Sequence, residues 1–337
     1  MSLSNALLTS FPQPASTSEY DEAAAEFESL LSELPGAVAV YRFGNVRAPG
    51  ISDLDRLVVV ETSGPRPVPD RWKRLSARTR YLALHSPFLV DSRTFATHRW
   101  FSDASPLELG SGSSIEIEPR PCPEFTNALI AAEGLVETLL KLAKLGTTGR
   151  AKVRSLLCEL NTVRLNLELA GIDRLAAPRA WDLADDVGRL RETWWTLGPD
   201  ERVSRFRRLL ATAVTGTWEA LAVLGARHSE GDRVPEVPLR AEWSRVTLVP
   251  GNTSGNGFSR ASPQLVGRSR RLGEKIWRAV PRRVEVPAAA LGLLGRTRPE
   301  HRDVRAERDE IVRRYDAFMS EARGYSSLGV ARVFLQR

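Results

Sequence analysis

Two aspartates placed just before an apolar run constrain the fold of this chain more than any other segment. Residues 53–57 read Asp-Leu-Asp-Arg-Leu and lead directly into three valines at 58–60. Side chains alternate between the two faces of a strand, so Asp53 and Asp55 should point one way and Leu54 the other. Two like charges on one face repel each other unless a cation lies between them, and carboxylate oxygens favour Mg²⁺ or Mn²⁺. The pattern therefore predicts a strand with a cation site at its start.

The residues before this pair form the segment that leads into the predicted strand. An apolar run at 37–43 predicts another strand, and Gly44 and Asn45 follow it as a turn. The seven residues 46–52 form a short, turn-rich connection to Asp53. The order is therefore strand, glycine-polar turn, loop and acid-x-acid strand.

This order resembles the nucleotidyltransferase superfamily, which includes DNA polymerase β, the aminoglycoside nucleotidyltransferases and the minimal nucleotidyltransferases. The matching positions are Phe43-Gly44-Asn45 and Ser52-Asp53-Leu54-Asp55. Two features depart from the family pattern. Asn45 stands where Ser or Gly is usual, and the spacer is shorter than is common.

The resemblance implies an Mg²⁺-dependent nucleotidyltransferase that moves a nucleoside monophosphate from an NTP to an unidentified acceptor. The absence of a Cβ at Gly44 would let backbone N–H groups approach a triphosphate, and the Asn45 amide would donate to a phosphate oxygen. The implied metal ligands are Asp53 and Asp55, and the implied nucleotide-binding residues are Gly44, Asn45, Arg47 and Ser52. Arg42 is also near enough in sequence to contact phosphates.

Catalysis in this family requires a third carboxylate on a following strand. After a helix expected over 70–76, strands are expected over 81–84 and 88–91, and the second of these ends in Asp91. Asp91 is equally well explained as a turn residue. The alternating run 115–118 predicts an edge strand and offers Glu116 and Glu118, whose simpler interpretation is solvated side chains on a half-exposed strand.

Two other functions fit the acid pair. A catalytically degenerate nucleotidyltransferase fold would serve as a binding or regulatory protein, and Asn45 favours that hypothesis. A metal-dependent glycosyltransferase would use Asp-x-Asp to hold a nucleotide sugar. In such enzymes the acids usually follow an apolar strand, whereas here they precede one, which weighs against this alternative.

Length and composition limit the remaining possibilities. A chain of 337 residues can form two domains, each with its own core. No apolar run approaches the roughly 20 residues needed to cross a bilayer, so no membrane association is expected. Cys122 and Cys158 are too few for a disulfide framework, and a reducing cytoplasm is the expected location. Scattered histidines and the absence of phosphate-loop or dinucleotide motifs disfavour zinc hydrolases, P-loop kinases and Rossmann dehydrogenases.

The expected fold class is α+β, with a small mixed-sheet nucleotidyltransferase core followed by a helical bundle. A flexible arm is expected first, and a helix capped near Ser18 opens the core. Apolar residues at helical spacing then predict the bundle helices, which end near residues 146, 171, 197 and 227. The expected parts are an arm at 1–17, the core at 18–120, the bundle at 124–230, and a basic loop-rich segment with a C-terminal helix at 231–337.

Arginine dominates the positive charge of the chain, whose formal net charge is +7. Basic residues gather at 260–298, where only two glutamates oppose them. This segment is a candidate surface for nucleic acid. A solvated arginine-rich helix over 268–280 is the simpler interpretation, because charge runs alone are weak evidence.

Overall fold

Four strands form the sheet that carries the acid pair. In the computed structural model, which describes residues 3–61, 74–84, 87–92, 95, 107–116, 124–228, 239–241, 246–251, 264–268, 277–280 and 283–295, the strand order of this sheet is β4-β3-β2-β5. The strands are β2 (Ala37–Phe43), β3 (Asp55–Val60), β4 (Phe88–Asp91) and β5 (Glu108–Gly112). β2 is antiparallel to β3 and to β5, whereas β4 is parallel to β3. The sheet is therefore mixed, and the combination of helices and small sheets confirms the α+β class.

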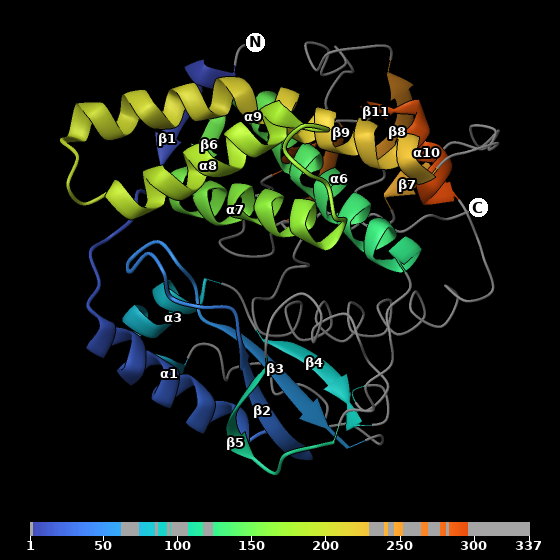
Figure 1. Cartoon of the computed structure of the whole chain (residues 1–337). Coiled ribbons are helices and arrows are strands. Elements are labelled where there is room, and N and C mark those ends of the chain that lie inside the picture. Colours follow the sequence, from blue (N-terminus) through green and yellow to red (C-terminus); the bar gives the residue numbers. More distant parts are fainter. Residues whose placement is uncertain are drawn as a thin grey trace.

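β3 is buried on both faces, which explains its continuous apolar sequence. Val58 and Val60 pack in a core with helices α1 (Thr17–Ser32) and α3 (Ala77–Ala83). Leu57 and Val59 pack on the opposite face with Phe95. Figure 1 shows the two helices beside the sheet, beneath the larger helical part of the molecule.

Two local predictions in this part of the chain are wrong. Residues 81–83 belong to helix α3 and not to a strand, because the Ser76 hydroxyl caps that helix by accepting a hydrogen bond from the Thr79 N–H. A short apolar run does not by itself distinguish a buried helix from a strand. The edge strand expected over 115–118 is not formed at residues 115 and 116, which have no regular structure, and 117 and 118 lie outside the described residues; the edge strand next to β2 is β5. The helix expected over 70–76 falls largely outside the described residues.

The N-cap of helix α1 is Ser16, two residues before the predicted cap. The Ser16 hydroxyl accepts from the Glu19 N–H, and the Glu19 carboxylate accepts from the Ser16 N–H at 2.8 Å. This reciprocal pair satisfies two backbone donors at the start of the helix.

A bundle of long helices lies above the sheet (Figure 1). It contains α6 (Glu124–Thr148), α7 (Val153–Leu169), α8 (Pro178–Thr193) and α9 (Pro199–His228), at the positions where apolar periodicity predicts helices. Their apolar faces form one core with large buried side chains, among them Trp194 and Phe206. Within the part of the chain that the structure describes, α9 alone is long and apolar enough to cross a membrane, but 56% of its most apolar window is buried inside the protein. The predicted cytoplasmic location stays a prediction.

The segment predicted as a flexible arm begins instead inside the bundle. A short 3₁₀ helix (Leu3–Asn5) buries Leu3, and β1 (Leu7–Thr9) pairs in parallel with β6 (Arg150–Lys152). The Arg207 side chain donates to the Ser4 carbonyl. The chain then leaves the bundle to form α1, so its first residues connect the two parts of the molecule.

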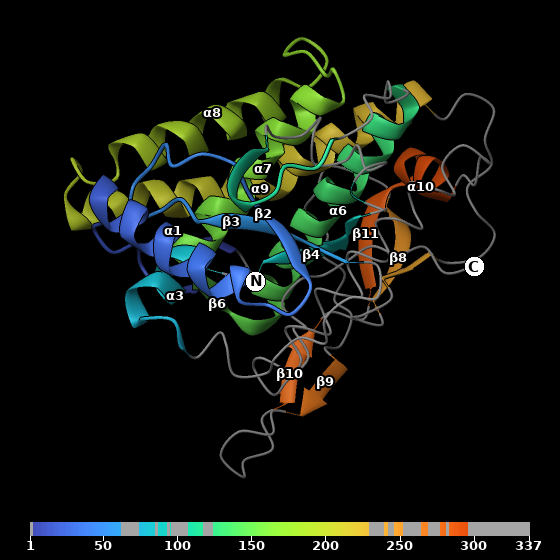
Figure 2. The ribbon, with the colours of Figure 1, turned by 90° about the horizontal axis from the view of Figure 1, so that it is seen from below.

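The described residues after α9 form small sheets and helix α10. β7 (Leu239–Ala241), β8 (Val246–Gly251) and β11 (Arg283–Pro287) form one sheet, and β9 (Gln264–Arg268) pairs with β10 (Trp277–Val280). Helix α10 (Ala288–Gly295) packs with β8 and β11 at one end of the bundle (Figure 2). The helix expected over 268–280 is contradicted by β10. Most side chains of the 260–298 segment, and the expected C-terminal helix, lie outside the described residues.

Candidate functional site

The structure brings Gly44 against one of the two predicted metal ligands. Phe43, at the end of β2, is the antiparallel partner of Asp55, at the start of β3. Gly44 then adopts a φ of +77°, a left-handed conformation that favours glycine. A Cβ on Gly44 would lie 3.4 Å from Asp55 Oδ2. The Asp55 carboxylate therefore lies beside the glycine bend, where a side chain on Gly44 would project.

Asp53 and Asp55 both act electrostatically on one residue of α7. Each is half-buried, and Leu54 between them is buried in the core with α1 and α3. Burial, followed by the negative charge of Asp53, raises the pKa of the Cys158 thiol, and Asp55 contributes in the same direction. Leu54 therefore points into the core, and the charges of both acids affect the Cys158 thiol.

The third carboxylate does not join this pair among the described residues. Asp91 is the parallel partner of Val60, five residues along β3 from Asp55. At about 3.3 Å per residue the two positions are about 17 Å apart. Glu116 is exposed beyond β5, and Glu118 lies outside the described residues. No group of three or more His, Cys, Asp or Glu side chains in the described ranges is arranged to hold a metal ion.

The predicted nucleotide-binding residues differ in their surroundings. Asn45 and Arg47 are exposed on the connection after Gly44. Ser52 is buried, and its hydroxyl oxygen accepts from the Ala48 N–H and from Arg191. Asn45 and Arg47 are accessible to a ligand, whereas the Ser52 hydroxyl contributes to the structure of the loop.

Arg42, the further arginine considered for phosphate contact, is engaged in an ion pair instead. Its guanidinium makes two contacts of 2.6 and 2.7 Å with the carboxylate of Glu28 on α1. This geometry assigns Arg42 to the packing of α1 on the sheet.

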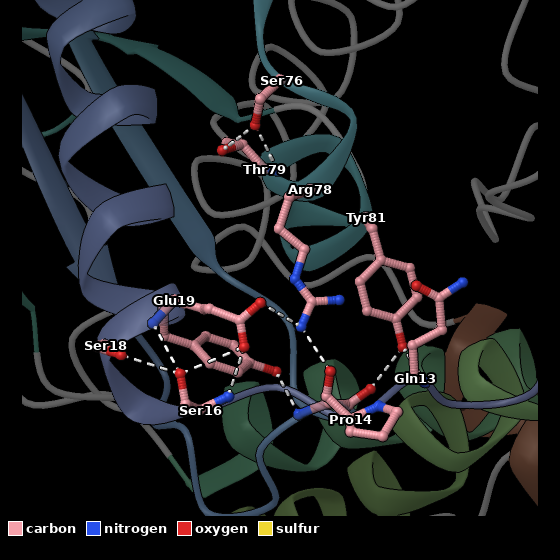
Figure 3. Close-up of polar contacts among 11 residues, drawn as sticks. Gln13, Pro14, Ser16, Ser18, Glu19, Ser76, Arg78, Thr79 and Tyr81 are labelled. Carbon is pink, nitrogen blue, oxygen red and sulfur yellow. Dashed lines mark hydrogen bonds and ion pairs between the residues drawn. The ribbon is translucent and has the colours of Figure 1, made fainter.

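The loop that precedes Asp53 is held from the side of α1 and α3 by two tyrosines. The buried Tyr20 hydroxyl donates to the Ser52 carbonyl at 2.6 Å and accepts from the Gly50 N–H at 3.0 Å. The Tyr81 hydroxyl donates to the Gly50 carbonyl at 2.7 Å and accepts from the Gln13 N–H. Figure 3 shows Tyr81 on α3 directed at the segment that leads into α1.

Arg78 ties the same two elements together beside Tyr81 (Figure 3). Its guanidinium donates to the Pro14 carbonyl at 2.5 Å and forms an ion pair with Glu19. The segment before α1 is thus connected to α3 at several points, and this connection supports the tyrosines that hold the loop.

The bundle holds the same loop from the opposite side. The Trp195 indole N–H donates to the Pro49 carbonyl at 2.9 Å, and the Cys158 thiol donates to the Ile51 carbonyl at 3.1 Å. Arg154, on α7, and Arg191, on α8, are buried and donate to residues 51 and 52. Sequence reasoning missed all four side chains, because nothing local distinguishes them from ordinary residues of amphipathic helices.

Removing the Tyr20 hydroxyl tests how much this anchoring contributes to stability. Tyr20→Phe should lower the free energy of unfolding by about 1–3 kcal/mol, because the buried Gly50 N–H loses its acceptor. Burial also raises the pKa of Tyr20 from 10.0 to about 12. The folded protein therefore keeps a proton that the unfolded chain releases, and wild-type stability should fall as the pH rises from 10 to 12.

The Tyr20→Phe variant lacks this contribution, so its stability should fall less over the same pH interval. Urea unfolding below pH 10 and between pH 10 and 12 measures both effects. Tyr41→Phe is the matched control, because it removes a buried tyrosine hydroxyl that accepts from the Ile115 N–H and lies away from the loop. Equal pH dependence in wild type and Tyr20→Phe would contradict the prediction.

Comparison with known proteins identifies no relative of this chain. No protein-family model matches it, and searches of curated proteins and of solved structures find no match either.

Proposed function

We propose that this protein is an Mg²⁺-dependent nucleotidyltransferase that transfers a nucleoside monophosphate from an NTP to an acceptor. The observation that carries the proposal is the position of the Asp55 carboxylate beside the Gly44 bend, with Asp53 two residues before it at the end of the same connection. Phosphate binding benefits from a glycine whose backbone a ligand can approach closely. Metal-assisted phosphoryl chemistry benefits from carboxylates next to that glycine.

The residues present fit a magnesium ion. Mg²⁺ is usually bound through one or two carboxylates, with water and substrate phosphate oxygens completing its coordination. Asp53 and Asp55 supply two such carboxylates, both half-buried at the start of β3. When bound, the ion would neutralise phosphate charge and polarise the phosphate that is attacked.

The chain's own residues then have separate tasks. Asp53 and Asp55 would hold the ion, and the bend at Gly44 would present backbone N–H groups to the triphosphate. Asn45 and Arg47 are exposed on the adjoining connection, so their donors would be accessible to phosphate oxygens. Asp91 is too far along the sheet to serve as a ligand of the same ion.

Replacing both acids with their amides tests the proposal. Asp53→Asn with Asp55→Asn should abolish Mn²⁺ binding, measured by electron paramagnetic resonance, and the thermal shift produced by NTPs with Mg²⁺. An NTP at ten times its Kd should stabilise the wild type by about 1.4 kcal/mol. The substitution conserves size, so the fold without ligand should be retained.

Asp91→Asn is the matched control, since it removes another acid of the same sheet. It should leave Mn²⁺ binding unchanged. Metal-dependent NTP binding that survives in the double variant would contradict the proposal, as would a wild type that binds neither Mn²⁺ nor any NTP.

A binding or regulatory role without catalysis is the second candidate. It is favoured by one observation, the separation of about 17 Å between the positions of Asp91 and Asp55 in the sheet. In that case NTPs would bind with Mg²⁺ but no pyrophosphate would be released, whichever acceptor is offered. Nucleic-acid binding through the 260–298 segment stays a prediction, and salt-sensitive binding that the double Asp variant retains would support it.

A further inference from the structure

One guanidinium from the bundle contacts the backbone directly before Asp53 and the end of α3. Arg154 lies in the first turn of α7 and is 3% exposed. Its Nε donates to the Ile51 carbonyl at 3.1 Å, and one terminal nitrogen donates to the Ser52 carbonyl at 2.8 Å and the Leu82 carbonyl at 3.1 Å. The other terminal nitrogen donates to the Tyr81 carbonyl.

Arg154 is linked to Asp53's two neighbours in the chain, to Ser52 directly and to Leu54 through a shared carbonyl. Ser52 directly precedes Asp53, and the N–H of Leu54, which directly follows it, donates to the same Leu82 carbonyl at 3.1 Å. The loop and the end of α3 are thereby fixed relative to each other by a single side chain. The planar fork of a guanidinium can span several carbonyls, which the single nitrogen of a lysine cannot.

Arg191 supplies a second anchor from α8. It is buried, and it donates to the Ser52 hydroxyl oxygen and to the Leu157 carbonyl, both at 3.1 Å. The Leu157 contact fixes the guanidinium to α7, so Ser52 is connected to two helices of the bundle. Burying two cations carries a desolvation cost, which their hydrogen bonds to the loop and to the helices offset.

We propose that Arg154 and Arg191 are positioning residues that hold Asp53 and Asp55 in the geometry needed to bind a divalent cation. This inference rests on the proposed function. Residues that do not bind a metal themselves but orient its ligands typically lower metal affinity by 10–100-fold when they are replaced. The bundle thus contributes to cation binding through these two side chains, although neither arginine is a metal ligand.

The test uses Arg154→Lys in the full chain, with Mn²⁺ alone as the probe. The variant keeps the positive charge but cannot reach four carbonyls together, so Mn²⁺ affinity should fall by about 10–100-fold. Hydrogen exchange of the Leu54 amide should become faster. Mn²⁺ affinity is measured well below the unfolding temperature of the variant, where replacing a residue that only stabilises the fold would leave it unchanged, and amide exchange shows whether the backbone beside Asp53 has loosened.

Arg164→Gln is the matched control. Arg164 lies on the same helix, is partly exposed and pairs with Asp185. This variant should bind Mn²⁺ as the wild type does. If Arg154→Lys does not fold, Arg191→Lys tests the same loop and should also lose Mn²⁺ affinity.

The outcomes separate this inference from the proposed function. A wild type that does not bind Mn²⁺ overturns both. A wild type that binds Mn²⁺, together with folded Arg154→Lys or Arg191→Lys variants that bind it equally well, overturns the positioning role alone.

Discussion

Replacing Gly50 with alanine should destabilise the protein by about 3–5 kcal/mol, through backbone strain and overpacking. Gly50 has a φ of +82°, in the left-handed region that side chains disfavour. A Cβ there would lie 2.3 Å from the Gln13 carbonyl oxygen and 2.8 Å from Trp195 Cζ2. Neither neighbour can withdraw easily, because the first is backbone and the Trp195 indole is hydrogen-bonded to Pro49. Urea unfolding, with the slope compared between wild type and variant, measures the change.

Gly171→Ala separates the effect of backbone strain from the effect of overpacking. Gly171 has a φ of +59°, but a Cβ there would meet no atom within 4 Å. Its substitution should therefore cost only the conformational penalty, about 1–2 kcal/mol. Equal losses in the two variants would contradict the tight enclosure of the loop before Asp53.

Local sequence patterns predict the helices and strands that bury an apolar face along their whole length. The bundle helices follow from apolar residues spaced at three and four, and β3 follows from an apolar run long enough to be buried on both faces. The proximity of Gly44 to Asp55 was also predictable, because the two residues flank one connection between adjacent strands. Separation along the chain is small in each case, so local pattern and final contact agree.

Predictions fail where the outcome depends on distant segments. The first residues are polar and proline-containing, yet pairing with residues 150–152 places them in the bundle. Asp91 ends a correctly predicted strand, but the parallel register places it beside Val60 and away from Asp55. Arg154 resembles any arginine on an amphipathic helix, and its partners lie more than 70 residues away in the sequence. Strand register and long-range pairing cannot be read from any short stretch of the sequence.

Replacing Glu28 with glutamine should be as costly as the Gly50 substitution, with a loss of about 3–5 kcal/mol. The Glu28 carboxylate is buried and contacts two arginines, Arg42 at 2.6 Å and Arg56 at 2.8 Å. Arg56 is 3% exposed, and burial lowers its pKa while the charge of Glu28 opposes that effect. The neutral amide would leave a buried cation without its counter-charge. Chemical denaturation at neutral pH measures the loss.

The same substitution should also disturb the candidate site, because Arg56 donates to the Asp55 carbonyl at 2.8 Å. Mn²⁺ affinity should therefore fall in Glu28→Gln even at temperatures where the variant is folded. Glu201→Gln is the matched control, since Glu201 pairs with Arg205 on the exposed face of α9 and its loss should cost at most about 1 kcal/mol. If Glu28→Gln were as mild as this control, Arg56 would not depend on Glu28 for its burial. The packing of α1 would then have to maintain the start of β3 through apolar contacts alone.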